Sequence, residues 1–219
     1  MTQITIRHRT SYRYPAAVKL GFHRLMLRPR ESCDVRLKAF RLSIQPEAKV
    51  GWAHDVFGNA VATAIVGQET EGLVIESISK LELVSAAWPI FDIAASAISY
   101  PFRYSDEEWT DLGALTVSNY PDPAGRLSAW ARNFIAGNPT DTLSLLKDLS
   151  AGVSSWISYQ SRDTEGTQPP VQTLERGWGS CRDLAVLFVK AVRSLGFGAR
   201  IISGYLFDPD STPGRNERQ

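Results

Sequence analysis

Residues 177–185 read Gly-Trp-Gly-Ser-Cys-Arg-Asp-Leu-Ala, and this stretch decides how the second half of the chain is interpreted. Ser180 and Asp183 have the spacing of a capping box, in which each side chain binds the backbone amide of the other residue. The spacing predicts a helix whose first residue is Cys181. Apolar residues continue the helix at a 3.6-residue period up to Gly196, which is expected to follow its end. These apolar residues are Leu184, Ala185, Phe188, Val192 and Leu195.

Two interpretations of Cys181 follow from this placement. Its phase matches that of Leu184 and Phe188, so it could be a small buried hydrophobe. Alternatively, the unpaired N–H groups and the dipole of a helix N-terminus favour a reactive thiolate, and such groups could also stabilise an oxyanion. In this second interpretation Trp178, Gly179 and Ser180 border the substrate cleft and the oxyanion site. Periodicity alone leaves both interpretations open.

Composition narrows the class of protein. The 219 residues are 43% hydrophobic and 21% charged, with a net charge of +1, which is typical of a globular chain of one large or two small domains. Without a basic field, a nucleic-acid or membrane partner is not expected. We see no secretory signal and no run of about 20 apolar residues, and we expect a cytoplasmic protein.

The cysteines and histidines suggest neither a disulfide nor a metal site. Cys33 and Cys181 are far apart and lie in dissimilar contexts. His8, His23 and His54 are scattered and belong to no cluster of metal-ligand spacing. We therefore expect free thiols, no metal and no cofactor.

Residues 1–85 are expected to form a β domain. Apolar and polar residues alternate along residues 4–14 and 40–45, which is typical of strands with one buried face. Val56-Phe57-Gly58-Asn59-Ala60 predicts a hairpin turn, since Gly and Asn tolerate positive φ. Residues 73–84 are apolar on both parities and predict a central strand. These strands together predict a small sandwich or curled sheet.

Residues 86–121 are interpreted as a connector with a short capped helix from Ser105 through Leu112. A helix capped by Asp122 and Pro123 is expected to follow. Thr140 or Asp141 should cap another helix, and a strand should cover residues 199–207. The apolar stripe expected in the helix after residue 141 is Leu146, Ser150, Val153, Trp156 and Ile157.

Residues 176–206 resemble the core motif of the transglutaminase-like superfamily, in which Gly-x-Cys-x-Asp-x-Ala is followed by Arg, Leu-Gly, Ala-Arg and Ser-Gly-Tyr. The N-terminal part is similar to the β domain that precedes this core in bacterial members. The resemblance implies an α+β fold, with a β-sandwich-like domain before a papain-like core at residues 122–219. It also implies a Cys-His-Asp triad with Cys181 as the nucleophile. The matching residues are Arg193, Leu195, Gly196, Ala199, Arg200 and 203–205 in the core, and Tyr12, Tyr14, 27–30 and 55–59 in the β domain.

The family's histidine and aspartate follow the Ser-Gly-Tyr segment, but residues 208–219 contain no histidine. We therefore expect the triad to be completed beyond residue 219 and this chain to be inactive or nearly so. The chain would be a fragment or a natural short form. None of His8, His23 and His54 is expected to replace the missing base.

The resemblance implies thiol-dependent acyl transfer, or hydrolysis of an amide or peptide bond, through a thioester on Cys181. The substrate would be a protein or peptide. The alternative is a non-catalytic binding or scaffold protein on the same fold. A third interpretation, a core cysteine in an unrelated α+β domain, requires the motif match to be accidental. The sequence predicts no oligomeric state.

Overall fold

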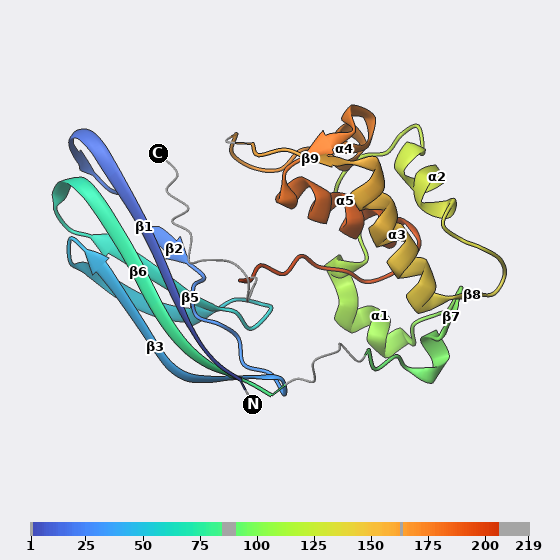
Figure 1. The fold of residues 1–219 in the computed structure, drawn as a ribbon, viewed down its shortest axis with the longest axis horizontal. Coiled ribbons are helices and arrows are strands. Elements are labelled where there is room, and N and C mark those ends of the chain that lie inside the picture. Colours follow the sequence, from blue (N-terminus) through green and yellow to red (C-terminus); the bar gives the residue numbers. More distant parts are fainter. Residues whose placement is uncertain (1, 85–90, 163, 206–219) are drawn as a thin grey trace. The chain divides into compact units, whose positions relative to one another are not determined.

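The computed structural model describes residues 2–84, 91–162 and 164–205, and the chain divides into two compact units, Met1–Phe91 and Asp92–Gln219 (Figure 1). The first unit is built from strands. The second is mainly helical and carries short β pairs. The predicted α+β class is confirmed, and the boundary between the units falls inside the predicted connector at residues 86–121.

The first unit consists of two three-stranded antiparallel sheets. One has β6 (Glu69–Leu83) between β1 (Thr2–Lys19) and β3 (Val35–Gln45), and the other has β5 (Ala60–Val66) between β2 (His23–Leu25) and β4 (Ala48–His54). Residues from both sheets meet in one apolar core, as expected for a sandwich. The predicted central strand is confirmed as β6. This core comprises Val66, Leu73 and Ile75, with Tyr14, Leu20, Leu25, Leu27, Leu42, Ile44 and Ala48 packed against it.

The predicted hairpin joins β4 to β5, and Gly58 adopts the positive φ (75°) that the turn requires. The Asp55 carboxylate fixes this turn by accepting hydrogen bonds from the Phe57 amide (2.9 Å), the Asn59 amide (2.8 Å) and the Asn59 side chain (2.8 Å). Arg30 donates to the Phe57 carbonyl oxygen at 2.9 Å. Residues 27–30 and 55–59, both of which resemble the family's β domain, are thus in contact at this turn.

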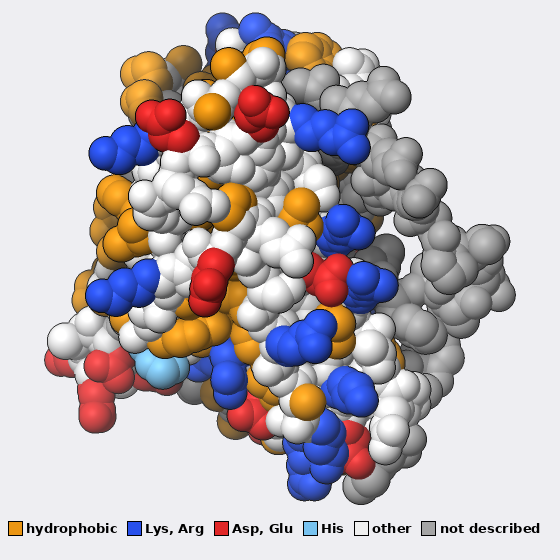
Figure 2. Space-filling model, turned by 90° about the vertical axis from the view of Figure 1, so that its left-hand side faces the viewer, with side chains coloured by type: hydrophobic (Ala, Val, Ile, Leu, Met, Phe, Trp, Pro, Cys, Tyr) orange, Lys and Arg blue, Asp and Glu red, His pale blue; other side chains and the backbone are white. Residues whose placement is uncertain are grey.

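The outward face of the β1–β6–β3 sheet is rich in basic side chains (Figure 2). Two acidic side chains of β6 pair with cations on the edge strands, Glu76 with Arg7 and Glu82 with Lys38, both at 2.8 Å. Charges on edge strands keep a face wetted and disfavour pairing with another chain. The basic residues at outward positions are Arg7, Arg9, Arg13, Arg36, Lys38, Arg41 and Lys80.

Helix α5 (Cys181–Ser194) is the centre of the second unit. It packs against α2 (Arg126–Arg132), α3 (Thr142–Trp156) and α4 (Pro170–Arg176). Gly196 follows its C-terminus with φ 96°, as predicted. The buried core here includes Leu127, Trp130, Ala131, Leu145, Leu149, Val153, Ile157, Leu187, Ala191, Val192, Leu195 and Phe197.

Two helix predictions need correction. Helix α2 begins after Gly125, which adopts a left-handed conformation (φ 63°), and not at Asp122–Pro123. Asp122 nevertheless supports this helix, because its carboxylate accepts from the amide and the hydroxyl of Ser128, both at 3.1 Å. In α3 the N-cap is Asp141, one of the two residues predicted for that position.

The predicted apolar stripe of α3 is confirmed at Val153 and Ile157, which are buried, and is wrong at its other three members. Leu145 and Leu149 are buried, whereas Leu146 is half-buried and Ser150 is exposed. Trp156, at the end of the helix, is 60% exposed. The stripe fails at these three positions because the burial of α3 is set by its contact with α5, and a run containing Leu145 and Leu146 fits either phase.

Residues 92–121 wrap around the C-terminal end of α5. They form η1 (Ala95–Ala97), β7 (Ser99–Tyr100), α1 (Asp106–Leu112) and η2 (Gly113–Leu115), and α1 has the predicted capping box. Strand β7 pairs with β8 (Thr140–Asp141). The Tyr100 hydroxyl donates to the Leu195 carbonyl oxygen at 3.0 Å, and the Tyr100 ring stacks on Phe197. This segment is therefore part of the second unit's packing.

The predicted strand at 199–207 is wrong over its described part. Residues 199–205 form no strand, and Ile201 and Ile202 are exposed. The physical reason is the lack of a pairing partner, because no strand in the described ranges lies in register with them. The Ala199 amide instead donates to the Leu115 carbonyl oxygen at 3.1 Å. Residues 206 and 207 lie outside the described residues.

Neighbouring leucines of α3 test the phase of its buried stripe. Leu145→Ala is expected to lower the free energy of unfolding of the second unit by about 2–5 kcal/mol, because the side chain is fully buried. Leu146→Ala, one residue on, should cost clearly less. Urea denaturation of both variants gives the comparison, and equal losses would contradict the observed phase.

Candidate active site

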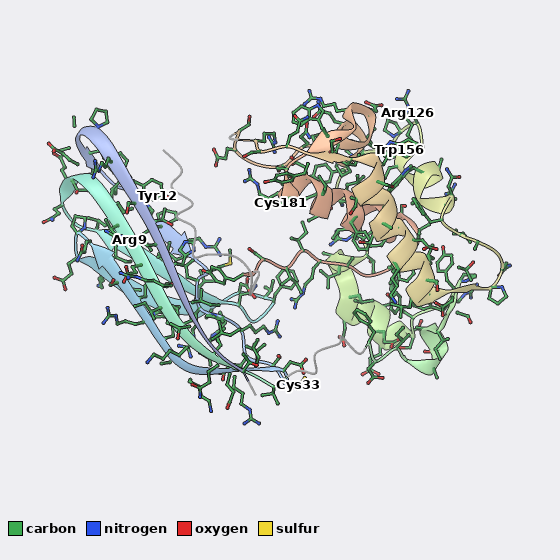
Figure 3. All side chains as sticks on the ribbon, viewed as in Figure 1. Arg9, Tyr12, Cys33, Arg126, Trp156 and Cys181 are labelled. Carbon is green, nitrogen blue, oxygen red and sulfur yellow. The ribbon has the colours of Figure 1, made fainter. Side chains whose placement is uncertain are left out.

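Cys181 is the first residue of α5, directly after β10 (Trp178–Gly179) and the N-cap Ser180. Strand β10 pairs in parallel with β9 (Ser158–Tyr159), which anchors the entry to the helix. The Cys181 side chain is exposed at this helix end (Figure 3). The interpretation of Cys181 as a buried hydrophobe is therefore wrong.

The helix phase explains this exposure. Over the first two turns of α5 the buried positions lie on a different face from the predicted stripe, and the two coincide only farther along, at Val192 and Leu195, which are buried. Leu184, Ala185 and Phe188, whose phase Cys181 shares, are only half-buried. At the helix start that half-buried face opens to solvent. The buried residues of the helix are Asp183, Val186, Leu187, Lys190, Ala191 and Val192.

Asp183 holds the start of α5 together. Its side chain is completely buried, and its carboxylate accepts from the Ser180 amide (2.9 Å) and the Ser180 hydroxyl (2.7 Å). The Gln168 amide donates to the other oxygen at 2.7 Å. Arg162 donates to both oxygens, at 3.1 and 3.0 Å. The capping-box residues were thus predicted correctly, and the carboxylate also binds the loop between β9 and α4.

These hydrogen bonds determine the charge state of Asp183. Burial by itself would raise the pKa of the Asp183 carboxyl. The hydrogen bonds from Arg162, Gln168 and Ser180 outweigh that cost and hold the pKa well below its usual range. The carboxylate is therefore ionised at neutral pH, and Arg162 forms a buried ion pair with it.

A second set of polar contacts holds strand β10, which precedes Cys181. The Gln168 side chain donates to the Trp178 carbonyl oxygen at 3.1 Å and accepts from Arg176 at 2.7 Å. The Arg176 guanidinium also lies over the Trp178 ring, 5.6 Å from its centroid. Trp178 is thereby fixed on its backbone and on its indole, two residues before the N-cap.

Both glycines of the motif have packing roles. A Cβ on Gly179 would lie 2.9 Å from the Asp183 Cβ and 3.2 Å from a Thr173 methyl group, so the close approach of β10 to α5 requires glycine. Gly177 ends α4 with φ 68°. The lack of a side chain thus serves the packing of β10 at Gly179 and the end of α4 at Gly177.

The backbone at the helix start offers donors for an anion. Both donors of Ser180 are committed to Asp183, whose own amide donates to the Ser180 carbonyl oxygen at 2.9 Å. The amides of Cys181 and Arg182 are the first two of the helix, and such groups have no intrahelical acceptor. An exposed sulfur beside them can attack a carbonyl carbon whose oxygen they then bind.

The histidines lie elsewhere in the chain. All three fall within residues 1–54, in the first unit. His8 is part-buried, with its Nε2 3.0 Å from the Thr10 hydroxyl, and His54 is the exposed last residue of β4. His23 is the first residue of strand β2. Residues 92–219 therefore supply Cys181 with no imidazole.

Sequence reasoning missed Arg162 and Gln168. Both lie in the polar loop at residues 160–169, where nothing in the local pattern distinguishes a buried partner from a solvated side chain. Cys33 and Cys181 are both free thiols, as expected. Over the described ranges, no group of His, Cys, Asp and Glu side chains could hold a metal ion, and no helix is long and apolar enough to span a membrane.

Two family profiles match the chain. The profile of the bacterial transglutaminase-like N-terminal region matches residues 4–82, and that of the transglutaminase-like superfamily core matches residues 128–218. Cys181 and its capping residues lie within the second match. The chain belongs to the transglutaminase-like superfamily.

Curated relatives and a solved structure are similar to this chain over most of its length. Uncharacterized proteins of Mycobacterium tuberculosis and Mycobacterium bovis are each 27% identical over 221 residues, which is 96% of this chain and 68% of each relative. A Cytophaga hutchinsonii structure described as a "putative cysteine protease" aligns with a TM-score of 0.66 at 13% identity. That match covers 88% of this chain and 63% of the solved chain, and it shows a shared fold.

Removing the charge of Asp183 is expected to destabilise the second unit. Asp183→Asn leaves Arg162 without its anion in a buried site, which should cost about 3–5 kcal/mol at pH 7. Glu175→Gln is the matched control. Glu175 pairs with Arg126 at the exposed surface, where loss of an ion pair costs about 1 kcal/mol or less. Equal losses in urea denaturation would contradict the structural role of Asp183.

The same carboxylate predicts a pH dependence. Because its pKa is depressed in the folded state, its stabilisation is present above the unfolded value of about 3.9 and is lost as the pH falls below it. The free energy of unfolding of the wild-type chain should therefore decrease as the pH falls below about 4. Asp183→Asn should show a smaller loss over the same range, measured as urea midpoints against pH.

Proposed function

We propose that this protein performs thiol-dependent acyl transfer through Cys181. The sulfur attacks the carbonyl carbon of an amide in a protein or peptide, and the C–N bond breaks to leave a thioester on Cys181 and a free amine. Water then releases the acid, or a second amine takes the acyl group. The single observation that carries the proposal is an exposed thiol at the N-terminus of α5, within the superfamily's core motif.

Each residue beside the sulfur has a role in the proposal. The amides of Cys181 and Arg182 bind the oxyanion, because the first N–H groups of a helix have no intrahelical acceptor and face its N-terminal end. Trp178, Gly179 and Ser180 border the cleft, with Ser180 and Gly179 serving chiefly to hold the helix start against Asp183. The Trp178 ring, which Arg176 holds in place, would form one wall of the substrate cleft, three residues before Cys181 in the sequence.

Amide chemistry also needs a group that protonates the leaving amine. Residues 92–219 contain no histidine, so this step requires an imidazole from outside that unit. We therefore propose that residues 1–219 alone can be acylated by an activated ester, whose leaving group departs without protonation, and that they turn over amides very slowly.

The acylation test separates these steps. The chain is mixed with 4-nitrophenyl acetate, and intact-mass and peptide analysis locates the acetyl group. One acetyl group on Cys181 is expected, formed faster than on Cys33, which is also an exposed free thiol. Cys181→Ala should abolish it, while Cys33→Ser should leave it unchanged.

Amide hydrolysis by the same sample should stay near background, with an increase on addition of free imidazole that Cys181→Ala removes. Acetylation of Cys181 no faster than of Cys33 would contradict the proposal. That result would favour the alternative, a non-catalytic binding or scaffold protein on the same fold.

A further inference from the structure

Arg162 lies outside the cysteine motif, in the loop between β9 and α4, yet it reaches the first turn of α5. Its Nε and Nη2 donate to the two oxygens of Asp183 at 3.1 and 3.0 Å, and Nη2 also donates to the Gly166 carbonyl oxygen at 2.8 Å. The Arg162 side chain is only 13% exposed and that of Asp183 is 0% exposed. The ion pair is therefore shielded from water and salt.

The neutral donors around Asp183 already fix its orientation. The Gln168 amide, the Ser180 amide and the Ser180 hydroxyl bind the carboxylate at 2.7 to 2.9 Å. These donors come from the loop and from the turn before the helix. Arg162 adds to them a full positive charge, which no other hydrogen-bond donor to this carboxylate carries.

That charge matters because of where Asp183 lies. It is two residues after Cys181, in the same first turn of the helix. An uncompensated carboxylate there would oppose a thiolate and offset the favourable field of the helix N-terminus. With Arg162 paired to it, the carboxylate can hold the turn without that electrostatic cost.

We infer that Arg162 is a positioning residue that acts through Asp183 and keeps Cys181 reactive by cancelling the carboxylate's charge. The inference rests on the proposed function, since it concerns the reactivity of the proposed nucleophile. It assigns Arg162, of the loop between β9 and α4, to the active site, although this residue does not belong to the cysteine motif.

Other charged groups near α5 are arranged differently. Arg182 is exposed and donates to the Thr164 carbonyl oxygen at 3.5 Å, while Arg176 binds Gln168 and Trp178. Lys190 and Arg193 lie two to three turns farther along the helix, next to Asn119. Among the residues that the structure describes, the remaining charged side chains on the loop, α2, α3 and α4 are exposed: Glu165, Arg126, Arg132, Lys147, Asp148 and Glu175.

The test measures the rate of Cys181 alkylation by iodoacetamide against pH, in the full 219-residue chain carrying Cys33→Ser. Because iodoacetamide reacts with the thiolate, the midpoint of this profile is the pH at which half of the Cys181 side chains are deprotonated. Arg162→Gln, which keeps a hydrogen-bond donor and removes the charge, should move the midpoint up by about one pH unit, a tenfold change in thiolate population below the midpoint. Arg162→Lys should retain most of the wild-type profile.

Two further variants separate charge from structure. In Arg162→Gln/Asp183→Asn both charges are gone, so the midpoint should return close to the wild-type value. Arg126→Gln removes the arginine of a different, exposed Arg–carboxylate pair in this unit and should not move the midpoint. A folded Arg162→Gln variant with an unchanged midpoint would overturn the inference, as would a double variant shifted as far as the single one.

The design also covers a variant that fails to fold. Circular dichroism and urea denaturation show whether each variant is folded. If Arg162→Gln is unfolded, the alkylation midpoint of Arg162→Lys is compared with that of the double variant instead. Nearly equal midpoints support charge compensation, and a shifted double variant contradicts it. Failure of the proposed function would show separately, as a wild-type midpoint at the free-thiol value of about 8.5 together with no acetylation.

Discussion

The buried carboxylate of Asp183 is the interaction on which the start of α5 depends. A buried carboxylate is costly unless it is paired and hydrogen-bonded. Here the cost is met by donors from two separate segments: the loop between β9 and α4, through Arg162 and the Gln168 amide, and the turn at Ser180. These contacts require the loop, β10 and α5 to fold together. The exposure of Cys181 follows from that arrangement, because the carboxylate turns inward two residues beyond it.

Acidic side chains also hold backbone turns elsewhere in the chain, and burial distinguishes them. Asp55 ties the β4–β5 turn with three hydrogen bonds, and Asp141 caps α3 through the Ser144 amide at 2.7 Å. Hydrogen bonds lower the pKa of both carboxyls, but neither is enclosed with a cation as Asp183 is. Loss of a surface cap costs about 1 kcal/mol, whereas breaking a buried ion pair costs several times more. The strongest constraint therefore lies beside the thiol.

Local chemistry made part of this structure predictable. The capping boxes at Ser105 and Ser180, the N-cap Asp141 and the turn at Gly58 were all predicted from a few adjacent residues, because their hydrogen bonds are local. The strands of the first unit followed from alternation along β1 and β3. The fold class and the cysteine's position at a helix start could thus be read from the sequence.

Long-range contacts set the features that could not be predicted. The phase of α3 depends on how it packs against α5, and the helix α2 starts where Gly125 turns the chain. Arg162 is 21 residues from its partner Asp183, in a loop without periodicity. Whether Cys181 is exposed depended on which face of α5 its neighbours cover. Periodicity gave its phase but not the position of the buried face.

The central claim is that the start of α5 presents the Cys181 sulfur to solvent as a reactive nucleophile. The most direct test compares two thiols within one molecule: the second-order rate constants for iodoacetamide at Cys181 and at Cys33, measured at pH 6.5 by peptide mass spectrometry. The account predicts that Cys181 reacts several-fold faster than Cys33. Equal rates, or slower reaction at Cys181, would contradict it.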